Sequence, residues 1–136
     1  MKKVTLFLIA IIQCSWLLCQ DYDSNFDTFL FKFATDKEFQ AERIKFPLEF
    51  RTWENPEEIG GEIITKSIEK AHWQHDYLYA NDNYRPQIYD NFEGKLRESD
   101  ERLFQWIGVE TGVNVKYFFK KLDSKWFLVK KEQLGD

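Results

Sequence analysis

RLFQWIGVETGVNVKYFFKKLDSKWFLVKK, residues 102–131, decides the fold class of this chain. Residues 102–109 are rich in strand formers and lead into the turn Glu110-Thr111-Gly112. Apolar and polar side chains then alternate over 113–122, and after a second short turn an apolar run follows at 125–131. Because short turns join strands that lie side by side, this stretch predicts a three-stranded antiparallel meander.

Upstream of the meander, the sequence predicts two short helices in succession. Behind the candidate N-cap Ser24, apolar residues recur with helical spacing at Phe26, Phe29, Leu30 and Phe33. Thr35 followed by Glu38 has the form of a capping box, which starts a second helix that runs to about residue 43. Helices first and a meander last predict an α+β domain, with the helices packed on one face of a curved antiparallel sheet.

The residues between the helices and the meander predict further strands. Residues 44–51 alternate between apolar and polar, and Pro47 places that strand at a sheet edge or at a bulge. Residues 62–80 favour a strand followed by a short helix. Residues 84–89 favour a strand that Pro86 places at an edge, and the polar residues 91–100, which include Gly94, predict a loop.

The N-terminal leader predicts export. Lys2 and Lys3 precede an apolar stretch of roughly 16 residues that ends at Cys19, shorter than the ~20 residues of a membrane-spanning helix. We therefore expect a signal peptide over 1–19, and a single domain over 20–136 in the periplasm or cell envelope. Cleavage after Cys19 releases a soluble protein. The alternative is lipidation of Cys19, which anchors the domain to a membrane, although Leu18 is not the small residue usual at that position.

Composition excludes several classes of chemistry. With 19 basic residues against 23 acidic ones the chain is acidic, so we expect no nucleic-acid partner. Both cysteines, Cys14 and Cys19, lie in the leader, which leaves the predicted domain without a disulfide, a thiol nucleophile or a cysteine metal site. No phosphate-cradling glycine loop or Gly-x-Ser-x-Gly motif is present, and we predict no cofactor.

Several phrases of the sequence carry a resemblance to a known family. They are FQAERIKFP at 39–47, WQHDYL at 73–78, IYDN at 88–91, KYFF at 116–119 and WFL at 126–128. In order and content they resemble a family of uncharacterised exported proteins of Bacteroides-type bacteria, a domain of unknown function. The order of elements resembles the nuclear-transport-factor-2-like, or cystatin-like, α+β cone. The resemblance implies fold and export, and it supplies no catalytic residues.

Aromatic side chains make up 18% of the chain and suggest a ligand-binding site. Rings can stack on a sugar or another planar or apolar ligand, with neighbouring polar groups for hydrogen bonds. The candidate ligand-binding residues are Trp73, His75, Asp76, Tyr77, Trp106 and Tyr117. For each ring the alternative is simple packing in the core.

Two other chemistries compete for the same segment. His72 and His75, three residues apart on a helix, can face one way and bind a metal together with Asp76 or a distant carboxylate. The sequence does not identify which residue would complete the ligand set, so we predict no metal site. Acid and base at the mouth of an apolar pocket can be supplied by Asp76 with Tyr77 or by His75 with Asp90. The basic strip along the last two strands is predicted to be a solvated strand face: Lys116, Lys120, Lys121, Lys125, Lys130 and Lys131.

We therefore predict a non-catalytic module of the cell envelope that binds a small ligand or another protein, with a homodimer through the open sheet face as a further hypothesis. The alternative is a small pocket enzyme that uses His75 and Asp76. The space between the helices and the sheet discriminates between these hypotheses. If phenylalanine side chains fill it, the enzyme and the enclosed small-ligand hypotheses both lose their cavity.

Overall fold

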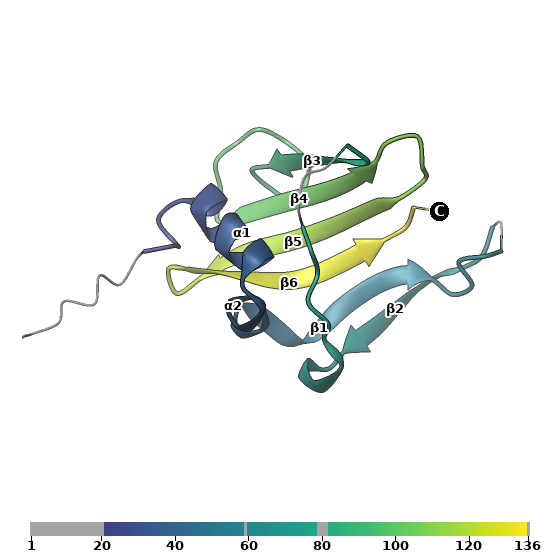
Figure 1. Cartoon of the computed structure of the whole chain (residues 1–136), viewed down its shortest axis with the longest axis horizontal. Helices are drawn as coiled ribbons and strands as arrows, with labels where there is room; N and C mark the ends of the chain where they lie inside the picture. Colours follow the sequence, from purple (N-terminus) through teal and green to yellow (C-terminus); the bar gives the residue numbers. More distant parts are fainter. Residues whose placement is uncertain (1–20, 59, 79–81, 136) are drawn as a thin grey trace, which may run out of the picture.

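The computed structural model describes residues 21–58, 60–78 and 82–135 as one mixed sheet with two short helices across one of its faces (Figure 1). Its elements are α1 (Phe26–Thr35), α2 (Lys37–Glu42), β1 (Ile44–Trp53), β2 (Ile63–Ile68), the 3-10 turn η1 (Lys70–His72), β3 (Tyr84–Tyr89), β4 (Glu101–Gly108), β5 (Asn114–Leu122) and β6 (Lys125–Gln133). This confirms the α+β architecture. The predicted signal peptide, with Cys19, lies outside the described residues.

Both predicted helices are present, but their caps are one residue later than expected. The side chain of Asn25, not Ser24, accepts the first free N–H groups of α1. Asp36, not Thr35, caps α2. Thr35 is still helical, and its hydroxyl donates to a carbonyl within α1, so it cannot act as the cap.

The sheet has the strand order β2-β1-β6-β5-β4-β3. The meander β4-β5-β6 is confirmed, and β3 is an edge strand, as Pro86 indicated. β1 is not at an edge, because it lies between β2 and β6 and pairs in parallel with β6. The irregularity expected at Pro47 is present as a register shift between Ile44 and Glu49.

The segment after β2 departs from the sequence prediction. The expected short helix is only the turn η1, and residues 73–78 form neither helix nor strand. These six residues, here called the crossing segment, pass over the same sheet face that the helices cover (Figure 1).

Phenylalanine side chains fill the space between the helices and the sheet. Phe29, Phe33 and Phe119 are fully buried, and the Phe119 ring meets the other two edge to face at centroid distances of 5.7 and 5.1 Å. Trp126 and Phe26 close one end of this core, with ring centroids 5.1 Å apart. Over the described residues, the enzyme and enclosed-ligand hypotheses therefore lose the internal cavity that they need.

Asp23 ties the start of the described chain to the sheet. Its carboxylate accepts hydrogen bonds from the Arg43 guanidinium at 2.7 and 2.9 Å and from the Trp126 N–H at 2.8 Å. Burial by itself raises the pKa of Asp23, but these hydrogen bonds outweigh burial, and the pKa lies below its usual value. The ion pair fastens both helices to the beginning of β6.

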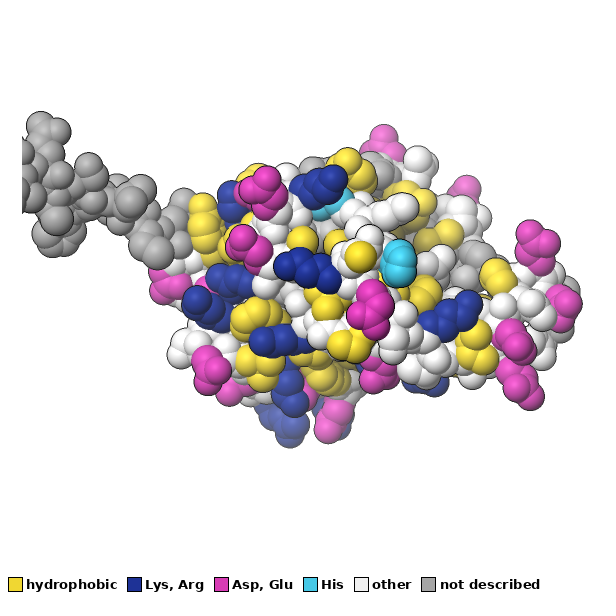
Figure 2. Space-filling view, turned by 90° about the horizontal axis from the view of Figure 1, so that it is seen from below, with side chains coloured by type: hydrophobic (Ala, Val, Ile, Leu, Met, Phe, Trp, Pro, Cys, Tyr) yellow, Lys and Arg dark blue, Asp and Glu magenta, His cyan; other side chains and the backbone are white. Residues whose placement is uncertain are grey.

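The surface is uneven in charge. Figure 2 shows acidic side chains gathered at the end of the molecule formed by the loop between β1 and β2; this tip carries the exposed residues Glu54, Glu57, Glu58 and Glu62. Because these carboxylates repel one another, the side chains of this tip are most stable when they are fully surrounded by water. Within the described residues, no helix has the length and apolar character required to cross a bilayer.

Candidate functional site

Three of the predicted site residues, Trp73, Asp76 and Tyr117, belong to one polar cluster that joins the crossing segment to α2 and the sheet. The hub of the cluster is Gln40 of α2, which is completely buried. Its amide nitrogen donates to the carbonyls of Phe33 and Asp76 at 3.0 and 2.9 Å. Its amide oxygen accepts from the indole N–H of Trp73 at 3.1 Å and the backbone N–H of Asp76 at 2.9 Å. All four hydrogen-bonding positions of this side chain are therefore used, and the crossing segment is fixed to α2.

The carboxylate of Asp76 is held against the sheet. Lys131 of β6 donates to its Oδ2 at 2.5 Å, and the Tyr117 hydroxyl of β5 donates to the same oxygen at 3.0 Å. Burial raises the pKa of Tyr117, and the adjacent Asp76 carboxylate raises it further, so the phenol stays protonated and acts as a donor. The cluster is an ion pair with a supporting hydrogen bond, and it secures the crossing segment. This geometry gives no support to acid/base chemistry by Asp76.

Lys131 corrects a prediction. It was assigned to a solvated strip, but its side chain is only 13% exposed. Val129 is an extra residue in β6, since Leu128 pairs with Phe119 and Lys130 with Phe118. This bulge brings Lys131 to the helix-covered face, opposite Tyr117. No feature of the lysine-rich sequence predicts the bulge that turns Lys131 inward. In the same way, the sequence around Gln40 does not predict that this side chain is buried and makes four hydrogen bonds.

His75 and Tyr77 lie beside the cluster. Their rings meet edge to face at 4.7 Å, and Tyr77 is 69% exposed. His75 Nδ1 is buried and has no hydrogen-bond partner within the described part of the chain. The helix that would align His72 with His75 is absent, because η1 ends at His72 and His75 lies in the irregular segment after it. Among the described residues, no three His, Cys, Asp or Glu side chains are grouped as a metal site.

Trp106 is separate from these residues and belongs to the core. It is buried in β4, stacked on Tyr84 at a centroid distance of 5.2 Å and packed against Phe104 at 5.9 Å. Trp106 therefore packs in the core, which was the alternative to ligand binding for each candidate ring.

An open apolar groove, which no pattern in the sequence predicts, lies between α1 and the edge strand β3. Its volume is about 390 Å³. Its apolar lining includes Leu30, Phe31, Ala34, Leu78, Ile88 and Phe104. Phe31 is 72% exposed on α1, and Leu78, the last residue of the crossing segment, is buried. The polar cluster therefore supports the groove by holding the segment that carries Leu78.

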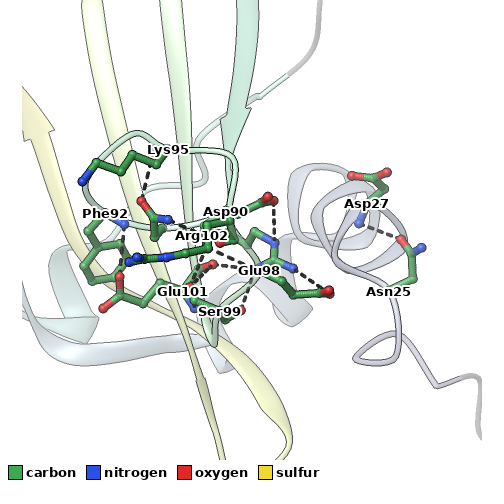
Figure 3. Close-up of polar contacts among 11 residues, drawn as sticks. Asn25, Asp27, Asp90, Phe92, Lys95, Glu98, Ser99, Glu101 and Arg102 are labelled. Carbon is green, nitrogen blue, oxygen red and sulfur yellow. Dashed lines mark hydrogen bonds and ion pairs between the residues drawn. The ribbon is translucent and has the colours of Figure 1, made fainter.

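One end of the groove continues into a polar pocket of about 220 Å³, and the two share Asp27 and Ile88. Figure 3 shows the residues of this end: Asp90 and Arg102 on the sheet side, and Asn25 and Asp27 at the start of α1. All four line the pocket. Arg102 donates to the carbonyls of Ser99 and Glu101 at 2.6 and 2.7 Å. The groove thus has an apolar body and a charged end.

Solved structures with the same fold come from Bacteroides. An NTF2-like protein from Bacteroides fragilis shares 23% identity with a TM-score of 0.58, and the match covers 82% of this chain and 47% of that one, so this chain spans about half of its length. A cystatin-like protein from Bacteroides caccae shares 24% identity with a TM-score of 0.50 over 79% of this chain and 74% of that one. This likeness shows the nuclear-transport-factor-2-like fold that the sequence predicted, and the fold alone.

Family membership is shown by sequence. No curated protein matches the chain significantly. Residues 15–133 match the family described as "Domain of unknown function (DUF4348)", which covers almost the whole chain. This chain belongs to the DUF4348 family.

Proposed function

We propose that this protein is an exported, non-catalytic interaction module that binds an apolar segment of a partner in the groove between α1 and β3. One observation carries the proposal: the exposed ring of Phe31 and the partly exposed Ile88 line the same apolar groove. Single apolar side chains at a surface are ordinary, but a continuous apolar groove with exposed walls indicates an interaction site.

The shape of the groove favours a protein partner over a small ligand. Small-molecule sites enclose most of their ligand, and the enclosed volume of this domain is occupied by Phe29, Phe33 and Phe119. An open groove instead covers one side of its occupant, as when side chains of a partner dock on a surface. The export part of the proposal rests on the leader sequence at 1–19.

The groove can be tested with the neutral apolar dye N-phenyl-1-naphthylamine, measured by fluorescence and by amide chemical shifts. We expect shifts at Leu30, Phe31, Ala34 and Ile88. Replacing Phe31 with Asp removes the burial of one ring, and we expect it to weaken dye binding about tenfold or more.

The matched control is Ile63→Asp. Ile63 is 42% exposed on β2, at the opposite edge of the sheet from β3. It should bind the dye as the unmodified protein does. Equal binding by the Phe31 and Ile63 variants, or shifts that avoid the groove, would refute the proposed site.

A further inference from the structure

The charged end of the groove selects the chemistry of its occupant. The Arg102 guanidinium approaches the carboxylates of Asp90 and Glu98 at 3.9 and 4.0 Å (Figure 3). Asp90 lines the polar pocket together with Arg102, and Asp27 adds a second carboxylate from the first turn of α1, whereas Glu98 is not part of the lining. The pocket therefore holds two carboxylates and one guanidinium, and this net negative charge makes it complementary to a positive charge next to an apolar group.

The chain itself carries a segment of that chemistry. Lys95, Leu96 and Arg97 follow one another in the loop between β3 and β4. Leu96 is 83% exposed, the highest value among the large apolar side chains of the described residues, and Phe31 is the next highest. Two cations thus flank the most exposed leucine, while the most exposed phenylalanine borders an apolar groove with an acidic end.

The loop is built to present Leu96. Asn91 is buried beneath it, and its side-chain oxygen accepts the Lys95 N–H at 3.1 Å while its nitrogen donates to the Arg97 carbonyl at 3.3 Å. The Phe92 ring anchors the loop on Phe118 of β5 at 5.2 Å. Because the backbone on both sides of Leu96 is already fixed, little conformational freedom is lost when Leu96 binds.

We infer that the partner in the groove is a second copy of this chain. Leu96 of each copy enters the groove of the other beside Phe31, and Arg97 faces Asp27. The loop starts at Asp90, which also lines the polar end of the groove, so loop and groove adjoin. Two copies can therefore exchange loops about a twofold axis in a closed, self-complementary dimer. This inference rests on the proposed function and names its partner.

The oligomeric state of the purified protein tests the inference by analytical ultracentrifugation from micromolar to millimolar concentration. We expect a reversible dimer. Leu96→Asp and Phe31→Asp should each raise the dissociation constant about tenfold or more, and Ile63→Asp should leave it unchanged. Asp27→Lys and Arg97→Asp should each weaken the dimer, and the two changes together should restore it.

The inference would be overturned if the protein stays monomeric at all concentrations, or if Leu96→Asp leaves the dimer unchanged. The second result would place the interface elsewhere, such as on the open sheet face.

Dye binding separates failure of the dimer inference from failure of the proposed function. In a monomeric Leu96→Asp protein the groove is uncovered, and the dye should bind at least as well as before. A monomer whose dye binding depends on Phe31 keeps the groove as a site for a different protein. A monomer that binds no dye refutes both.

Discussion

Single polar residues hold two parts of this domain against its apolar core: Asp23 holds the start of the described chain, and Gln40 holds the crossing segment. Gln40 is the central case, since one side chain satisfies a backbone N–H, an indole N–H and two carbonyls. Removing it leaves these groups unpaired in a buried place, which costs more than a hydrogen bond contributes.

We expect Gln40→Leu to lower the free energy of unfolding by about 3 kcal/mol, measured by urea denaturation followed by circular dichroism. Gln133→Leu is the control, because Gln133 is exposed at the end of β6 and should change stability by about 0.5 kcal/mol or less. Similar losses in the two variants would show that Gln40 is not the hub.

Asp23 gives a pH-dependent prediction at the same scale. Its pKa is lowered in the folded protein, so its carboxylate stabilises the fold above the unfolded pKa, near 3.9, and this contribution is lost as the pH falls through the folded value. Asp23→Asn should therefore cost about 2 kcal/mol at neutral pH. The difference from the unmodified protein should shrink below about pH 4, in denaturation curves recorded across the acid range.

The exposed Asp100 supplies the comparison for Asp23. Asp100→Asn should leave the stability within about 0.5 kcal/mol at each pH. A constant deficit of the Asp23 variant down to the lowest pH would contradict the assigned role of the carboxylate.

At the scale of elements, the crossing segment depends on the pairing of Asp76 with Lys131. Their side chains are 25% and 13% exposed, so either charge alone would be left in a poorly solvated position. Asp76→Asn and Lys131→Met should each cost about 2 kcal/mol or more. The double variant should cost less than the sum by at least about 1 kcal/mol, in a double-mutant cycle of unfolding free energies.

The pair Glu93 and Lys95 is a suitable control cycle, because it has a similar distance of 2.6 Å but side chains that are more than half exposed. Its coupling energy should stay below about 1 kcal/mol. Equal coupling in the two cycles would mean that Asp76 and Lys131 do not hold the segment in solution.

At the scale of the whole molecule, the sequence predicts an exported domain with its leader removed. Intact mass spectrometry of protein recovered from the envelope of an exporting bacterial host should give a chain that begins at Gln20. A mass for a chain that begins at an acylated Cys19 would instead establish the lipid anchor. Full-length chain starting at Met1 in the cytosol would refute both. Replacing Lys2 and Lys3 with Glu should slow export.

Much of the fold could be predicted because its signals are local. The apolar stripe of α1 and the alternation in β4, β5 and β6 reflect helix and strand periodicities that neighbouring residues specify by themselves. The same is true of the edge position of β3 at Pro86. The candidate site was predicted only in part, since Trp73, Asp76 and Tyr117 do meet, whereas Trp106 packs in the core.

By itself, then, the sequence determined the helix and strand periodicities, the α+β order and the acidic character of this protein. The tertiary structure alone decided that β1 lies between β2 and β6, that Gln40 is a hub, that Lys131 turns to the helix-covered face, and that Phe31 borders a groove. Asp76 meets Gln40, Tyr117 and Lys131 across 36, 41 and 55 residues of chain. Contacts at such separations depend on how whole elements pack, and a bulge at one residue reverses the face of every side chain after it, so no local pattern encodes them.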